Sequence, residues 1–284
     1  MNRILTCTDG SSYAPSVYDH SAWAARRCGA SVHVLHMIDP QREPGSFFDL
    51  SGNLGPDTGK GLLEEIVRVE ESRNRLARER GKNILAIARE HLESAGVTHV
   101  TVEQLHGTLV EVVTEMEERA DLVVLGKRGE SADFAKLHLG SSLERVIRAS
   151  RRPILVASRK FTPIDRFLIA YDGGPSVERA LRFVIEDPLL REIPCEILRA
   201  GKIDDKAKWY LEEAAAKLRE AGFEVNVRAV GGEPEDVIST VIREEKIPLL
   251  VMGAYGHSRI RQFILGSTTT EMIRTCQVPV LLFQ

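Results

Sequence analysis

Four small residues near the C-terminal end have types and a spacing that suit the binding of a phosphate group. Two residues separate Gly253 from Gly256, and nine separate Gly256 from the pair Gly266-Ser267. Glycine lacks a Cβ, so a ligand can approach its backbone closely. A helix that opens at Gly266 would direct its first N–H groups and positive dipole end at the ligand, with the Ser267 hydroxyl as an extra donor. The spacing therefore predicts a phosphate site, with Thr268 at the start of that helix.

A related set of small residues occurs earlier in the chain. Two residues separate Gly126 from Gly129, and ten separate Gly129 from the pair Gly140-Ser141. The pattern thus occurs twice in the chain, which favours a phosphate-binding arrangement over glycines that only form turns. Basic side chains that could balance a phosphate charge lie within each set. They are Lys127 and Arg128 in the set that begins at Gly126, and His257, Arg259 and Arg261 in the set that begins at Gly253.

Both glycine sets belong to an internal repeat of the chain. Three apolar runs, at residues 3–8, 120–126 and 152–156, return at 166–171, 248–253 and 278–282. An Asp-Gly pair follows the first run of each copy, at Asp9 and at Asp172. The chain therefore holds two copies of one domain, and the first copy carries about 36 additional residues between its first two runs.

The apolar runs are typical of strands, and the segments between them are typical of helices. The predicted strands are 3–8, 31–38, 98–104, 121–125 and 153–157, then 166–171, 195–200, 223–230, 248–252 and 279–283. The predicted helices are 14–28, 62–95, 176–185, 206–221 and about 268–275, the second being one helix or two interrupted at Gly81. Strands that are apolar almost throughout, and that alternate with helices, indicate a parallel sheet covered on both faces.

We therefore predict an α/β fold of two tandem, doubly wound domains. Each would be a five-stranded parallel sheet flanked by helices, over residues 1–158 and 163–284. The stretch 39–60 is rich in Gly, Pro, Asp and Ser. We expect it to be a long irregular loop of the first domain.

The composition excludes several classes of protein. The 284 residues are 43% hydrophobic and 28% charged, with a net charge of −3, which argues against a broadly basic nucleic-acid-binding protein. No apolar run reaches the roughly 18 residues of a membrane helix, and no signal-peptide core follows Met1. The four cysteines have no metal-binding spacing and favour a reduced, cytoplasmic protein without a metal site.

Other polar residues are expected to be solvated rather than functional. His20 and several scattered histidines are assigned to the surface, and His33 and His36 lie on opposite faces of a strand, where they cannot share a metal. The pairs Glu117-Glu118 and Glu244-Glu245 recur in the two copies and are expected at solvated helix ends. No P-loop and no Gly-x-Ser-x-Gly motif is present, so no catalytic residue is predicted.

The glycine pattern closely resembles that of the universal stress protein superfamily in its tandem form. The nucleotide motif of that family, Gly-x2-Gly-x9-Gly-Ser/Thr, matches Gly253, Gly256, Gly266 and Ser267 at every position. Asp172 matches the acidic residue of the family at the end of the first strand, beside the adenine and ribose. The resemblance covers essentially the whole chain except residues 39–60.

The resemblance implies that ATP, ADP or AMP binds through backbone contacts, with or without Mg²⁺. In the first copy, the corresponding residues are Asp9, Gly126, Gly129, Gly140 and Ser141, and the longer gap makes nucleotide binding there less favourable. The resemblance also implies that the two domains pair through their last strands as an internal pseudo-dimer, which could dimerise further.

Members of the superfamily are mostly small cytoplasmic regulators of survival under stress, so the resemblance favours a nucleotide-binding stress regulator with little or no catalysis. One alternative is a partner-binding scaffold whose pockets are relics. Another is an enzyme that transfers adenylate or hydrolyses ATP. The protein partner and the stress signal are not predicted.

Overall fold

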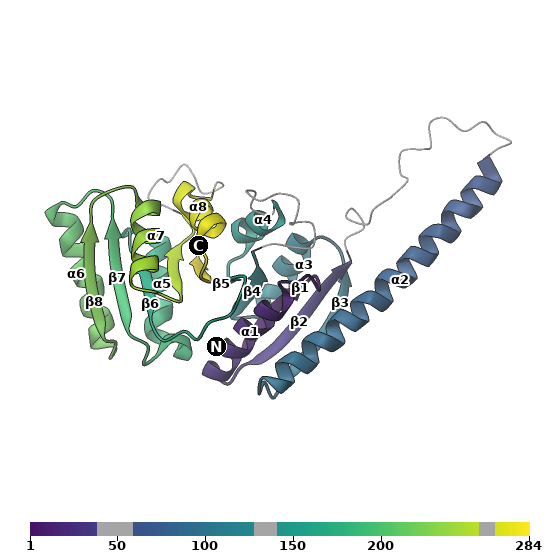
Figure 1. Cartoon of the computed structure of the whole chain (residues 1–284), viewed down its shortest axis with the longest axis horizontal. Helices are drawn as coiled ribbons and strands as arrows, with labels where there is room; N and C mark the ends of the chain where they lie inside the picture. The colour runs from purple at the N-terminus through teal and green to yellow at the C-terminus, as the bar shows by residue number, and fades with distance from the viewer. Residues whose placement is uncertain (39–58, 128–140, 256–264) are drawn as a thin grey trace.

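The computed structural model of the chain describes residues 1–38, 59–127, 141–255 and 265–284, and it shows a mostly parallel sheet flanked by helices (Figure 1). All ten predicted strands are present. Their bounds are β1 Arg3–Thr8, β2 Ser31–Ile38, β3 Val100–His106, β4 Leu122–Gly126, β5 Ile154–Ala157, β6 Phe167–Ala170, β7 Cys195–Ala200, β8 Val225–Val230, β9 Leu250–Gly253 and β10 Val280–Phe283.

Helices connect these strands in both halves of the chain. Their bounds are α1 Ala14–Cys28, α2 Gly59–Ser94, α3 Leu109–Met116, α4 Ser141–Ala149, α5 Pro175–Glu186, α6 Asp205–Glu220, α7 Pro234–Glu244 and α8 Ser267–Thr275, with short 3₁₀ helices at Glu117–Arg119 and Pro188–Leu190. The predicted helices are present, whereas α3, α4 and α7 have no counterpart among the predicted helices. Across the described ranges, none of the helices combines the length and apolarity needed to cross a lipid bilayer.

The ten strands form one sheet in the order β3-β2-β1-β4-β5-β10-β9-β6-β7-β8. Each half therefore has the same doubly wound order, which reverses between β1 and β4 and again between β6 and β9. The halves meet where β5 pairs antiparallel with β10, with Val156 opposite Val280 and Ile154 opposite Leu282. The expectation that the last strands pair is confirmed.

The central strands of the sheet are buried on both faces, as their apolar sequences predict. In β4, Leu122 and Val124 pack into one apolar cluster, and Val123 and Leu125 pack into another. Since successive side chains of a strand point to opposite faces, these clusters lie on the two sides of the sheet. Helices cover both clusters, so the α/β class of the prediction is confirmed.

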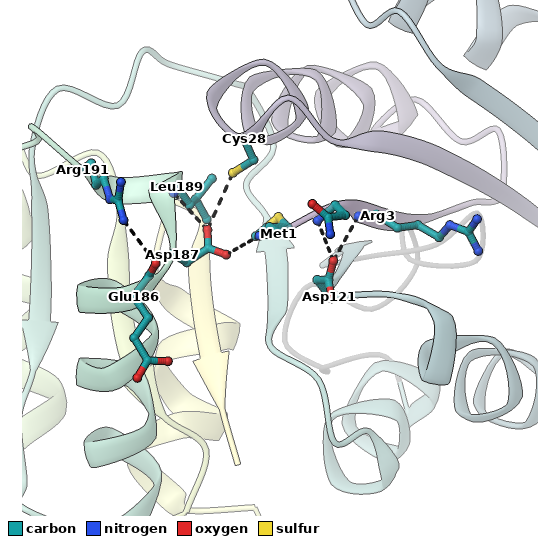
Figure 2. A network of polar contacts seen from close by, with 9 residues as sticks. Met1, Arg3, Cys28, Asp121, Glu186, Asp187, Leu189 and Arg191 are labelled. Atoms are coloured by element: carbon teal, nitrogen blue, oxygen red, sulfur yellow. Dashed lines mark hydrogen bonds and ion pairs between the residues drawn. The ribbon is translucent and has the colours of Figure 1, made fainter.

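A second contact joins the two halves beside the N-terminus (Figure 2). The N-terminal amine forms a 3.0 Å ion pair with the carboxylate of Asp187, at the end of α5, and the Cys28 thiol donates to the same carboxylate at 3.7 Å. In α1, Arg27 donates through Nε to the Leu189 carbonyl at 2.9 Å. Because partners from both copies are tied together here, the halves pack through helices as well as through the sheet.

Helix α2 is continuous, so the alternative with a break at Gly81 is wrong. Gly81 instead allows the helix to pass close to the sheet, because a Cβ at this position would lie 2.7 Å from Cδ2 of His36 and closer still to the Gln104 amide. The helix begins at Gly59, which shortens the predicted 39–60 loop at its end. Residues 39–58 lie outside the described part of the chain.

His20 is buried, which contradicts its assignment to the surface. Its side chain is fully enclosed, its Nδ1 lies 2.6 Å from the carbonyl oxygen of Ser16, and its ring packs edge-on against Phe161 at 5.0 Å between centroids. None of the described residues provides a hydrogen-bond partner for its Nε2. Burial lowers the pKa of His20 to about 4, because the imidazolium would lose its hydration.

Glu117 is also buried, although the repeated Glu-Glu pair predicts a solvated helix end. Its carboxylate accepts hydrogen bonds from the Ser150 hydroxyl and from the backbone N–H of Arg151 at 3.0 Å. Arg152 donates through Nε to the Glu117 carbonyl at 3.1 Å. Glu117 therefore joins the 3₁₀ turn after α3 to the segment that leads into β5, which is a structural role.

Candidate functional site

The C-terminal half has a topological switch point between β6 and β9. These strands are parallel neighbours, with Ala170 opposite Met252 near their carboxyl ends. Their continuations, Asp172 and Gly253, therefore come to the same edge of the sheet. Open α/β sheets bind ligands in the crevice at this edge, so the topology places the predicted C-terminal residues where a ligand site is expected.

Asp172 forms the turn that starts α5. Its Oδ1 accepts a hydrogen bond from the N–H of Gly174 at 2.8 Å, and Gly173 adopts the left-handed φ of 77°. The Asp172 carbonyl accepts a hydrogen bond from the guanidinium of Arg199, on β7. These contacts fix the position of the Asp172 carboxylate at the switch point.

The start of α8 is held against the end of β9. The Thr269 hydroxyl donates to the Gly253 carbonyl at 3.1 Å, and the N–H of Gly266 donates to the Ala254 carbonyl at 3.2 Å. The structure thus brings Gly253, Gly266 and Ser267 together. Gly256, the remaining member of the motif, lies outside the described residues.

Gly266 is the N-cap of α8, and within the part of the chain that the structure describes no side chain caps the first turn of this helix. Its φ of −58° and ψ of 143° are extended, and Ser267 is exposed. The Thr268 hydroxyl, which the sequence places at the same site, lies 3.3 Å from the carboxylate of Glu235 on α7. An uncapped helix start presents N–H donors and a partial positive charge, which is an anion-binding arrangement.

Gly253 has a packing role in addition to its place in the motif. A Cβ at Gly253 would lie 2.8 Å from the Ser176 Cβ and 3.2 Å from the Val177 nitrogen. Strand β9 therefore approaches α5 at a distance that only glycine allows. The close contact brings the start of α5 toward the same edge of the sheet as α8.

Tyr171, the residue before Asp172, holds α5 in position through a hydrogen bond. Its hydroxyl donates to the Glu178 carboxylate of α5 at 2.7 Å. Burial, followed by this hydrogen bond to a carboxylate, raises the pKa of Tyr171. The phenol thus stays neutral and anchors α5 beside Asp172.

The N-terminal half has the same aspartate turn as the C-terminal half, but a side chain of α2 packs over it. Asp9 accepts a hydrogen bond from the N–H of Ser11 at 3.0 Å, and Gly10 has a φ of 70°. Ile84 of α2 packs over this turn, because a Cβ on Gly10 would lie 2.5 Å from its Cδ1. The side chain of Ile84 therefore occupies space beside the turn of the first copy.

The corresponding position of α6 is Tyr210, since Ile84 and Tyr210 each lie twelve residues before the glycine that follows the helix, at Gly96 and Gly222. Tyr210 is 42% exposed, whereas Ile84 is buried. The helix of the second copy thus leaves this side chain in solvent.

Lys127, a predicted counter-charge for phosphate, contacts the other half of the chain in this structure. Its ammonium donates to the carbonyl of Cys276 and, at 3.3 Å, to that of Val278, both in the other half. Reciprocally, the Tyr255 hydroxyl donates to the Arg148 carbonyl at 3.4 Å. The segments after β4 and β9 therefore help to join the two halves.

Only some of the other predicted site residues of the first copy lie in the described part of the chain. Gly126 ends β4 and Ser141 begins α4. Gly129 and Gly140 lie outside the described residues, as do Arg128 and the basic side chains between Gly256 and Gly266. Within the described residues, His, Cys, Asp and Glu side chains form no group of three or more that could hold a metal.

Comparison with known proteins agrees with this architecture and decides the family. The model of the universal stress protein family matches residues 1–158 and 196–284. A universal stress protein of Synechocystis sp. is 37% identical over 287 residues, which cover 100% of both chains. The chain belongs to the universal stress protein family.

A solved structure of another universal stress protein shares the fold. This protein, from Archaeoglobus fulgidus DSM 4304, covers 100% of this chain and 96% of its own, with 22% identity and a TM-score of 0.67. A shorter universal stress protein from Archaeoglobus fulgidus, solved in complex with dAMP, covers 42% of this chain and 97% of its own, with 26% identity and a TM-score of 0.34.

In this universal stress protein, the described motif residues of the second copy converge on one edge of the sheet. Sequence reasoning missed the contacts that Lys127 and Tyr255 make across the halves, and no local pattern signals them, because the acceptors are backbone carbonyls far away in the sequence. It also missed Arg199 and Thr269, which hold Asp172 and Gly253 in place. The alternation of side chains along β7 indicates the face of the sheet on which Arg199 lies. Its hydrogen bond to the Asp172 carbonyl cannot be predicted without the fold, because the two residues are far apart in the sequence.

Proposed function

We propose that this universal stress protein binds an adenine nucleotide at the carboxyl edge of its C-terminal half and acts as a stress-response regulator. The candidate ligands are ATP, ADP and AMP. The observation that carries the proposal is the uncapped start of α8, held by Thr269 against the end of β9 and next to the Asp172 turn. Phosphate groups and a nucleoside would occupy the two ends of this crevice.

The phosphates would bind to the first N–H groups of α8. Gly266 supplies no side chain to cap those donors, and exposed Ser267 adds a hydroxyl beside them. The positive end of the helix dipole favours an anion at this place. Asp172 would accept hydrogen bonds from the nucleoside, because its carboxylate is fixed at the adjoining strand end.

The C-terminal half is the proposed site for three reasons. Its Gly253 set keeps the nine-residue gap, whereas the first set has ten. Lys127 of the first copy is engaged by carbonyl groups of the other half. Ile84 packs over Gly10, beside the turn where the nucleoside of the first copy would lie. We accordingly keep 1–158 and 163–284 as proposed domain boundaries, with nucleotide in the second.

The proposed role is regulatory, with little or no catalysis. The donors at the site are backbone N–H groups and hydroxyls, which bind phosphate but do not activate water. Mg²⁺ would accompany ATP as part of the ligand. The four cysteines are free, and three of them are buried, which supports a reducing compartment such as the cytoplasm.

Heating the purified protein until it denatures should release adenine nucleotide, which can be identified by chromatography. Added ATP should also raise the melting temperature of nucleotide-free protein by roughly 5 °C, because a ligand at about 100 times its Kd stabilises the folded state by about 2.7 kcal/mol. GTP at the same concentration is the control for general phosphate binding. Protein that releases no adenine nucleotide and shows no shift with ATP would contradict the proposal.

A further inference from the structure

Helix α2 is far longer than its counterpart in the other half. It has 36 residues, whereas α6 has 16, and both end just before a glycine. The additional turns therefore lie at the N-terminal end of α2, which extends away from the sheet (Figure 1). Gly81 is the first buried position along the described side chains of α2. At 1.5 Å per residue, the 22 residues before it span about 33 Å.

We call residues 65–80 of α2 the arm. Its side chains are exposed or half-buried throughout, and they include Val67 at 50% exposure and Leu76 at 69%. Isolated helices of this length are marginal in water, because most of the stability of a helix in a protein comes from packing of its apolar face. Among the described residues, the apolar side chains of the arm belong to neither apolar cluster of the sheet.

The apolar positions of the arm follow the spacing of a coiled coil. Ile66, Val69, Arg73 and Leu76 are spaced by three, four and three residues, which places them on one stripe. Val69 is 36% exposed, and Arg73 can pack its aliphatic stem within such a stripe. A partner helix of the same kind would cover the stripe.

The charges of the arm identify the partner. Residues 65–71 contain three glutamates and one arginine, whereas residues 73–80 contain four arginines and one glutamate. Two copies that run antiparallel bring the acidic part of each against the basic part of the other. Two parallel copies would stack Arg73 on Arg73 and Arg80 on Arg80, which like charges disfavour.

We propose that the arm pairs with the arm of a second copy of this chain in an antiparallel coiled coil centred near residue 71. Ile66 of each copy lies opposite Leu76 of the other, and Val69 lies opposite Arg73. The guanidinium of Arg73 then lies beside Glu70 of the other copy. The α/β bodies remain at opposite ends of the paired arms, and nucleotide binding is not required.

The mass of the full chain in solution tests the pairing. Light scattering after size exclusion should give twice the chain mass of 31.6 kDa for the wild type, and Leu76→Glu should raise the dimer dissociation constant at least about 100-fold, because both copies of the core position are lost. Ile87→Glu is the matched control, since Ile87 is 60% exposed on the same helix but lies beyond the arm. A monomeric wild type would overturn the proposal, as would a Leu76→Glu variant that stays dimeric.

Cysteine cross-linking tests the orientation. A chain carrying both Ile66→Cys and Leu76→Cys should form covalent dimers under mild oxidation, whereas Leu76→Cys alone should not exceed the wild-type background. Covalent dimers of the Leu76→Cys variant alone would mean a parallel pair and would overturn the antiparallel arrangement, as would a double variant that forms none. An unchanged melting temperature of each variant shows that the α/β body remains folded.

Discussion

Replacing Gly266 with valine should weaken adenine-nucleotide binding by at least about 100-fold, which corresponds to roughly 3 kcal/mol. A side chain at the N-cap lies next to the first N–H groups of its helix, so the branched side chain of valine would cover the donors that hold the phosphates. Valine can adopt the extended backbone of Gly266, with φ −58° and ψ 143°, so the protein should still fold. Fluorescence titration with a labelled ATP analogue measures the affinity.

The matched control is Glu233→Val. Glu233 is the N-cap of α7 in the same half, with an extended backbone and no side-chain cap bond to lose. This variant should bind nucleotide as the wild type does. If both variants lose the same affinity for nucleotide, the effect comes from a general change at a helix N-cap. If Gly266→Val binds nucleotide with unchanged affinity, the proposed site at α8 is contradicted.

Lowering the pH from 7 to 4.5 should cost the folded protein about 2 to 3 kcal/mol through His20 alone. The pKa of His20 in the folded chain is about 4, below the ordinary value of 6.5, because burial opposes the charged form. The unfolded chain therefore binds more protons between these values. The stability contribution is complete above pH 6.5 and is lost as the pH falls toward 4.

Several neighbours set the charge around His20. The Ser16 carbonyl and Asp19 favour the protonated ring, whereas Lys127 disfavours it, and the loss of hydration outweighs them. Urea unfolding at both pH values should show a smaller pH dependence for His20→Asn, which keeps a donor toward Ser16 but does not titrate. His99→Asn is the control, since His99 is exposed. Equal pH dependence in wild type and His20→Asn would contradict this account.

Much of the fold follows from local patterns. The strands were predictable because continuous apolar runs, closed by glycine or proline, are typical of strands buried on both faces. The pairing of β5 with β10 came from the family resemblance, since nothing in those two apolar strands specifies their antiparallel order. Helix α3 carries a signal that could have been used, because Thr108 and Glu111 form a reciprocal capping box.

The remaining features depend on tertiary contacts. The sequence signals at Gly81 and His20 are misleading, because a glycine within a helix usually indicates a break and an isolated histidine usually indicates a solvated residue. Their environments arise from a close approach of α2 to the sheet and from the packing of Phe161 on α1. The same holds for Lys127, whose local sequence suggests a phosphate ligand but whose acceptors lie in the other half.

Isothermal titration of nucleotide-free wild-type protein with ATP and Mg²⁺ tests the central claim most directly. We expect one ATP per chain, bound with a Kd in the micromolar range, about −8 kcal/mol, which would keep the site occupied at the roughly millimolar ATP of a cell. Two equivalent sites per chain would contradict the assignment to the C-terminal half. No binding would contradict the proposed function itself.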